Sequence, residues 1–369
     1  MRIVVYPADS SGCGSFRMIW PTEALVRQGH TEIELRPPDQ RDIKLKISGS
    51  RRDQKAFTED VLDISADVIV FQRITHRFMA EAIPILRSKG VAVVVDIDDD
   101  LSSIHPRNPA YEGYHPKNEW RISRETGEYS RSSWQHLATA CREATLVTAS
   151  TPALLKRYAA HGRGHVIYNH LPDHYYGVDH KDSDLIGWPA NLSSHPDDPE
   201  VVGGAVARLC GPSGGFQVIG DPTGCGAVFG LTTDPPGHDP VGPDGWPAAV
   251  AELGIGVCPL ADTKFNASKS WLKPLELSAL GVPWVGSPRM EYERFHKRGA
   301  GVLADTPRRW YRELKRLKES PELRRDRAES GRLVADGLRL ESNAWRWHEA
   351  WTRAYEIQHG RIGTRAVVV

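Results

Sequence analysis

The feature that most limits the fold of this chain is a series of short, wholly apolar runs separated by stretches of helical spacing. In the first half these runs lie at residues 2–6, 67–71, 91–96, 144–149 and 165–169. Strands that are apolar at every position are typical of a parallel sheet covered by helices on both faces. The pattern therefore predicts a doubly wound α/β domain.

The same pattern begins again in the second half, with runs at residues 184–188, 216–220, 254–260, 282–287 and 301–304. A chain of 369 residues suits two domains of ordinary size. We therefore predict two Rossmann-like domains facing across a cleft. The N-terminal one spans residues 1–172, a polar linker spans 173–183, and the C-terminal one spans 184–338.

The remaining residues, 339–369, contain a helix with Trp345, Trp347 and Trp351. This helix is too apolar for a free tail, so we expect it to pack on the body, returning to the N-terminal domain.

Two segments interrupt the alternation of strands and helices. Residues 105–128 are predicted to form an irregular excursion at the rim of the cleft, and residues 232–247 a loop rich in proline and glycine.

Composition excludes several classes of protein. Lys plus Arg and Asp plus Glu are both 47, so no overall field attracts nucleic acid or an anionic membrane. The five cysteines show no metal-binding or disulfide spacing, which fits a reducing compartment. The sequence shows neither a secretory signal nor an apolar run long enough to span a bilayer. We expect a cytoplasmic protein without stable membrane insertion and without a partner nucleic acid.

The most informative segment is FNASKSWLKPLELSALGVPWVGS, residues 265–287. Its apolar spacing predicts a helix that ends at Gly281. The start of such a helix attracts phosphate through its unpaired N–H groups and its dipole. Lys269 and Lys273 add positive charge there, and Glu276 is placed to accept hydrogen bonds from ribose hydroxyls.

This segment resembles the donor-binding core of GT-B glycosyltransferases, in particular the retaining group related to glycogen and sucrose synthases. The resemblance implies that Lys269 and the amides near Ser270 and Trp271 bind the diphosphate, and that Glu276 binds the ribose. Many members carry a glutamate at the position of Ser268, so the identity of the sugar is open. The donor-binding residues that the resemblance implies here are Leu260, just before this segment, and Ser268, Ser270, Trp271, Leu272, Lys273 and Glu276 within it.

A second match is IGWPANLSSHPDD, residues 186–198, which resembles the strand and turn that open the C-terminal domain in this group. The resemblance places Gly187 and Trp188 at the donor, with glycine allowing the backbone to come close to a ligand. His195 and Asp198 are typical at the start of the next helix. Their alternative interpretation is helix capping, with even odds.

A third match is the glycine-rich turn after the first strand, SGCGSFR, residues 11–17. Gly12 and Gly14 are candidates for leaving room for a ligand, and Arg17 for binding the donor phosphates. The competing interpretation is a tight turn before a helix whose arginine pairs with a surface carboxylate.

A fourth candidate is DIDDDL, residues 96–101, at the carboxyl end of a strongly apolar strand. Ligands of open α/β sheets bind beyond the carboxyl ends of strands, so Asp98 and Asp99 are candidates for acceptor binding or electrostatic roles. Metal binding and capping of the next segment are the alternatives. We favour the first, because the resemblance implies a diphosphate held by amides and basic groups, with no metal or other cofactor.

Together these features predict an enzyme that moves a sugar from a UDP- or GDP-sugar to a hydroxyl of an acceptor, which is a glycan, a protein or a small molecule. Retention of configuration follows from the resemblance. Arg17, Lys269, Asp98 and Asp99 are the catalytic candidates. The alternatives are a sugar-nucleotide 2-epimerase and a degenerate GT-B protein that only binds nucleotide or acts as a scaffold.

Overall fold

The computed structural model describes residues 1–38, 43–49, 56–114, 120–122, 129–131, 133–211 and 214–363. The chain divides into two compact units. The first comprises residues 1–106, 110–169 and 343–369, and the second comprises residues 107–109 and 170–342. Parts of the predicted excursion, residues 115–119 and 123–128, lie outside the described residues.

A six-stranded sheet forms the centre of the first unit, with the strand order β10-β9-β6-β5-β1-β2. Every neighbouring pair in it is parallel. The central strands β5 and β6 are buried at every position, which is why their sequences are apolar except at Gln72 and Asp96. The strands are β1 (Ile3–Tyr6), β2 (Ile33–Leu35), β5 (Val68–Gln72), β6 (Ala92–Ile97), β9 (Leu146–Ala149) and β10 (Gly164–Val166).

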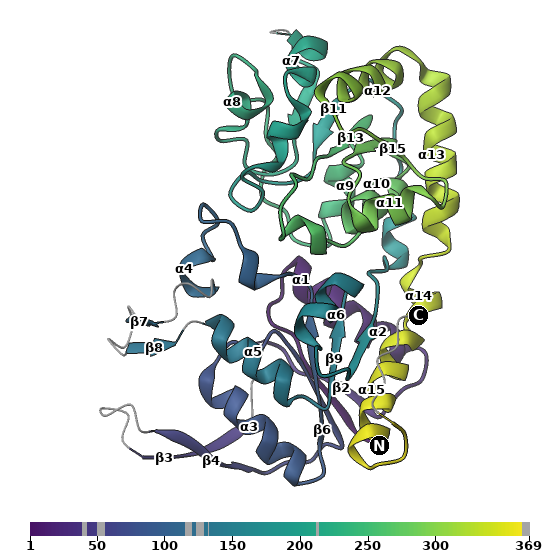
Figure 1. The fold of residues 1–369 in the computed structure, drawn as a ribbon. Helices are drawn as coiled ribbons and strands as arrows, with labels where there is room; N and C mark the ends of the chain where they lie inside the picture. The colour runs from purple at the N-terminus through teal and green to yellow at the C-terminus, as the bar shows by residue number, and fades with distance from the viewer. Residues whose placement is uncertain are drawn as a thin grey trace. The chain divides into compact units, whose positions relative to one another are not determined.

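Helices cover this first sheet. The C-terminal helix α15 (Trp345–Gln358), yellow in Figure 1, contacts β5, β6 and α2. Its Trp347 and Trp351 are fully buried, whereas Trp345 is exposed on the other side. The other helices of this unit are α1 (Gly12–Gly14), α2 (Trp20–Arg27), α3 (Arg77–Ser88), α4 (Tyr111–Tyr114), α5 (Ser133–Glu143) and α6 (Pro152–Tyr158). A π-helical turn, Ser15–Ile19, joins α1 to α2.

Two antiparallel strand pairs add to the first unit and were not predicted. One joins β3 (Lys44–Ser48) to β4 (Phe57–Leu62), and the other joins β7 (Trp120–Ile122) to β8 (Tyr129–Arg131). The residues of β3 are exposed or half-buried, so the strand lacks the apolar run on which the strand predictions rest.

The second unit has a five-stranded parallel sheet with the order β12-β11-β13-β14-β15. The fold class predicted from the sequence, two doubly wound α/β halves, is thereby confirmed. The predicted apolar runs supply all the strands of this sheet. They are β11 (Ile186–Trp188), β12 (Phe216–Val218), β13 (Ile255–Cys258), β14 (Trp284–Gly286) and β15 (Val302–Leu303).

Local sequence signals explain where several helices of the second unit begin and end. Thr306 and Ser320 cap the N-termini of α12 and α13 through their hydroxyl oxygens, each followed by a proline. Helix α10 ends at Gly281, which adopts φ +75°. The helices are α7 (Ala205–Cys210), α8 (Cys225–Phe229), α9 (Trp246–Val250), α10 (Leu272–Leu280), α11 (Met290–His296), α12 (Pro307–Glu319), α13 (Pro321–Asp336) and α14 (Leu340–Asn343).

The segment predicted as a linker, residues 173–183, packs within the second unit. Tyr175 is fully buried there, and its hydroxyl donates to Glu276 on α10. Residues 343–369, which include α15, cluster with the first unit. None of the helices among the described residues combines the length and the apolar character needed to span a bilayer.

Candidate functional site

The candidate site of the second unit lies at the start of α10, which follows the 3-10 turn Asn266–Ser268 after strand β13. Both predicted lysines are half-buried there. The Lys269 ammonium lies 4.3 Å from the centre of the Phe265 ring. Burial, followed by the charge of Lys269, lowers the pKa of Lys273. Lys269 and Lys273 thus both bring positive charge to the positive end of a helix dipole.

His195 connects Lys273 to the loop after β11. Its Nε2 lies 3.4 Å from the Lys273 Nζ, and its Nδ1 lies 2.8 Å from Asp198 Oδ2. Burial, then the nearby Lys273, lowers the pKa of His195 to about 4, so the ring is neutral at pH 7. A neutral ring that donates from Nδ1 to the carboxylate presents Nε2 as an acceptor, and the Lys273 ammonium donates to it.

Asp198 connects the loops that carry this cluster through hydrogen bonds. Its Oδ1 accepts hydrogen bonds from the backbone N–H of Ala261 and from the side chain of Asn266. Although burial raises the pKa of Asp198, the bond from His195 and these donors lower it overall. Asp198 therefore joins the loop after β11 to the loop after β13, and among the described residues its side chain makes no helix-capping bond. Asn266 is a positioning residue that sequence reasoning missed, because its partner is distant in the chain.

Glu276 lies one turn further along α10 and is buried, with 5% exposure. Its Oε1 accepts a hydrogen bond of 2.9 Å from the Tyr175 hydroxyl, and Trp246 supplies a second donor. Burial raises the pKa of Glu276 to about 7, against the effect of these donors and of Lys273. A carboxylate offers about four acceptor positions, so two donors leave room for ribose hydroxyls.

The raised pKa of Glu276 predicts a pH dependence of stability. Between its ordinary pKa of 4.5 and about 7, the folded protein holds a proton that the unfolded chain has released. Stability therefore falls as pH rises through this window, by at most about 3 kcal/mol. Glu276→Gln, which resembles the protonated form, should flatten the change in melting temperature between pH 5 and pH 8.

The control for this measurement is Glu329→Gln, which alters an exposed glutamate on α13. This variant should reproduce the wild-type pH profile of melting temperature. If Glu276→Gln retained that same profile between pH 5 and pH 8, then Glu276 would titrate outside this window and its raised pKa would be contradicted.

Several predicted donor-binding residues of the second unit lie in its core. Trp188, Leu260 and Trp271 are each at most 2% exposed. Ser268 is buried, and its hydroxyl donates to the Phe265 carbonyl. At Gly187 a Cβ would collide with the side chain of Leu253, so packing explains this glycine without a ligand. These residues shape the site from within the core.

Ser270 and Leu272 remain at the surface of the candidate site. Both are half-buried, and the Ser270 hydroxyl accepts a bond of 3.4 Å from the Leu272 N–H. Lys269, Ser270, Leu272 and Lys273 thus lie at the start of α10, and Glu276 lies one turn further along the same helix.

In the first unit, Arg17 is buried with 1% exposure. Its guanidinium binds both oxygens of Asp96 and donates to the Ile167 carbonyl and to Asn169. The centre of the Trp347 ring, on α15, lies 5.5 Å from the carbon of the same guanidinium. These contacts give Arg17 a structural role in place of the predicted catalytic one. The competing interpretation, pairing with a carboxylate, describes it better, although the carboxylate is buried.

The glycine-rich turn is shaped by Asp9, whose carboxylate accepts bonds from the N–H groups of Ser11 and Gly14. A Cβ at Gly14 would collide with the Asp9 carbonyl, which requires glycine there. A Cβ at Gly12 would meet only an ordinary contact, 3.8 Å to Phe16. Packing within the described residues therefore does not require glycine at this position.

Asp98 follows β6 and lies beside Arg73, with 3.4 Å between Asp98 Oδ1 and Arg73 Nε. Both of these atoms are buried and lack a hydrogen-bond partner among the described residues. Arg73 also binds Asp9 at 2.6 Å and has a strained φ of +49°. The charge of Asp98, then burial, raises the pKa of Cys13. Asp99 is half-buried next to this cluster, which lies at the carboxyl ends of β1, β5 and β6.

Comparison with solved structures identifies the fold that these two sheets define. A sucrose-phosphate synthase from Thermosynechococcus elongatus matches with a TM-score of 0.62 and 12% identity, covering 96% of this chain and 99% of that one. The HepE protein of Anabaena, in complex with UDP and glucose, matches with a TM-score of 0.59 and 15% identity over 95% and 99%. The catalytic domain of starch synthase IV from Arabidopsis thaliana, bound to ADP and acarbose, matches with a TM-score of 0.59 and 12% identity over 96% and 99%.

These matches extend over nearly the whole chain, so both α/β units have counterparts in the same order. The chain has the GT-B fold, as its sequence resemblance implied. No family model matches the sequence, and no curated protein sequence matches it.

Proposed function

We propose that this protein is a glycosyltransferase that moves a sugar from a nucleoside diphosphate sugar, UDP- or GDP-linked, to an acceptor hydroxyl. The single observation that carries the proposal is the half-buried ammonium of Lys273 at the start of α10. Among the described residues its nearest polar contact is the neutral Nε2 of His195, 3.4 Å away, and no carboxylate forms an ion pair with it.

A half-buried charge without a counter-ion is costly, and an anion bound at the same place offsets that cost. Lys269 adds a second cation beside Lys273, and the start of α10 adds the helix dipole. A diphosphate carries the charge and the acceptor oxygens that match this site. Glu276, further along α10, then accepts from the ribose hydroxyls of the same nucleotide.

The proposed reaction retains the configuration of the sugar. The acceptor oxygen bonds to the anomeric carbon, the bond from this carbon to the diphosphate oxygen breaks, and the acceptor proton passes to the leaving diphosphate. Lys269 and Lys273 would stabilise the negative charge that develops on the diphosphate. No metal is needed in this scheme because the two lysines and the helix amides supply the positive field.

The acceptor is proposed to be a glycan, a protein or a small molecule with a free hydroxyl, and Asp98 and Asp99 are kept as its candidate ligands. The Oδ1 of Asp98 supports this choice, because it is buried and has no hydrogen-bond partner among the described residues. The cysteines are all free, which fits a reducing compartment, so we place the reaction in the cytoplasm.

The test is a thermal-shift and calorimetric titration of the full chain with UDP, GDP, ADP and their sugars. One nucleotide should bind, and Lys269→Ala and Glu276→Ala should both weaken it. The matched control is Lys264→Ala, which removes an exposed lysine of the preceding loop. It should leave nucleotide affinity unchanged.

A donor-only incubation then separates the enzyme classes. A transferase hydrolyses the bound sugar nucleotide slowly and needs an acceptor for rapid turnover. Conversion of the sugar nucleotide into its epimer without an acceptor would show that the protein is a 2-epimerase and not a transferase. If none of the nucleotides bound, the proposal would be overturned, and the alternative of a scaffold protein would be favoured.

A further inference from the structure

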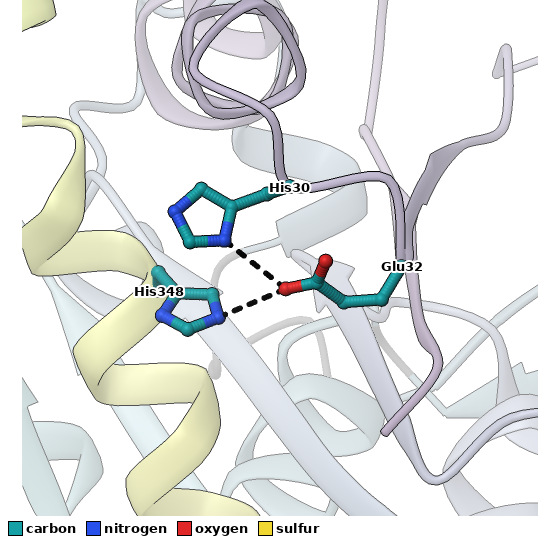
Figure 2. Close-up of side chains that lie close together, drawn as sticks. All are labelled: His30, Glu32 and His348. Carbon is teal, nitrogen blue, oxygen red and sulfur yellow. Dashed lines mark hydrogen bonds and ion pairs between the residues drawn. The ribbon is translucent and has the colours of Figure 1, made fainter.

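The first unit contains a cluster of two histidines and a glutamate that the proposed function does not use. His30 and Glu32 lie between α2 and β2, and His348 lies on α15 (Figure 2). Both rings point toward the same carboxylate oxygen (Figure 2). The distances to Glu32 Oε1 are 3.1 Å from His30 Nδ1 and 3.2 Å from His348 Nε2.

We propose that His30, Glu32 and His348 form a binding site for one zinc ion. Two imidazole nitrogens, one carboxylate oxygen and an open position for water make up a donor set that zinc uses. In tetrahedral zinc with bonds of about 2.0–2.1 Å, neighbouring ligand atoms lie about 3.3 Å apart. The separations of 3.1 Å and 3.2 Å from Glu32 Oε1 match this spacing. The three ligand atoms all lie within 4.8 Å of one another, so small rotations of the rings close the third edge.

The surroundings of the cluster leave room for a bound ion. All three side chains are half-buried, with 26–34% exposure, so the site is reachable and partly shielded from water. The centres of the two rings lie 4.3 Å apart, with an angle of 35° between the ring planes, close enough to share one ion. Without an ion, a nitrogen of each ring faces the single Oε1 of Glu32. A bound metal would take the place of the ring protons between these nitrogens and that oxygen.

The site would fasten α15 to the first unit. His348 comes from the last helix of the chain, whereas His30 and Glu32 adjoin β2, the edge strand of the first sheet. A zinc ion bound to all three joins the two ends of the sequence. Since such binding favours only the folded form, zinc should raise the melting temperature. This site is in the first unit, and its existence does not depend on the proposed transferase activity.

The test is a calorimetric titration of the chelator-treated full chain with Zn²⁺, together with the melting temperature with and without zinc. Wild-type protein should bind one ion per chain and melt at a higher temperature with it. His348→Ala and Glu32→Gln should each lower affinity by about 100-fold or more, since even losing an outer partner of a ligand costs about 10–100-fold. Far-UV circular dichroism checks that both variants fold.

The matched control is His359→Ala, which removes an exposed histidine just beyond the end of α15. It should bind zinc as the wild type does. Absence of saturable zinc binding to the wild type would overturn the proposal. So would equal affinity in wild type, His348→Ala and Glu32→Gln, because zinc would then bind elsewhere in the chain.

Discussion

Replacing Lys273 with alanine is expected to weaken binding of the nucleoside diphosphate by about 10-fold to 100-fold, the loss of one charge-assisted hydrogen bond. The reason is the position of its ammonium, half-buried at the start of α10 and held there by the Nε2 of His195. Calorimetric titration with the nucleotide that binds the wild type measures this effect. Lys264→Ala, in the exposed loop before α10, is the control and should bind as the wild type does.

The same variant separates ligand binding from a structural role. Removing a half-buried ammonium that has no carboxylate partner removes a desolvation cost. The nucleotide-free Lys273→Ala protein should therefore melt at the wild-type temperature or slightly above it. A clear fall in melting temperature, together with unchanged nucleotide affinity, would make Lys273 a structural residue and leave the proposed diphosphate site without its main support.

The second large effect is expected at Arg17, where replacement by alanine should destabilise the first unit by about 3–5 kcal/mol. Asp96 is fully buried, and both of its oxygens bind the Arg17 guanidinium. Without Arg17 its charge stays buried, and among the described residues only the Thr148 hydroxyl still donates to it. Chemical denaturation followed by circular dichroism measures the loss.

Two further variants make this result specific. Arg17→Met combined with Asp96→Asn leaves no charge in the pair, so it should recover part of the stability lost in Arg17→Ala. Arg27→Ala changes an exposed arginine at the end of α2 and should cost less than about 0.5 kcal/mol. A loss below about 1 kcal/mol in Arg17→Ala would show that the buried pair contributes little and would reopen a role of Arg17 outside the core.

The glycine positions illustrate what a sequence pattern leaves open. Gly14 and Gly187 were both predicted to make room for a ligand, yet the atoms that require glycine there belong to Asp9 and Leu253. A glycine indicates that something comes close to the backbone. Whether that neighbour is a ligand or another part of the chain depends on residues far away in the sequence.

The sequence alone determined the strands of the two parallel sheets except the edge strand β2, because apolar runs of strand length are a local pattern that burial on both faces imposes. It also determined α10, with Gly281 at its end and two lysines at its start, because helix ends follow local rules. The resemblance in residues 265–287 led to the GT-B fold, which the solved structures share.

Only the tertiary structure decided which charged groups are buried together. It paired Arg17 with Asp96, tied Asp198 to Asn266, and brought His348 against Glu32. None of these pairs has a local signature, since each joins elements that are distant in the chain. Spacing rules detect neighbours along a strand or helix, whereas contacts between distant elements depend on how the sheets and helices pack.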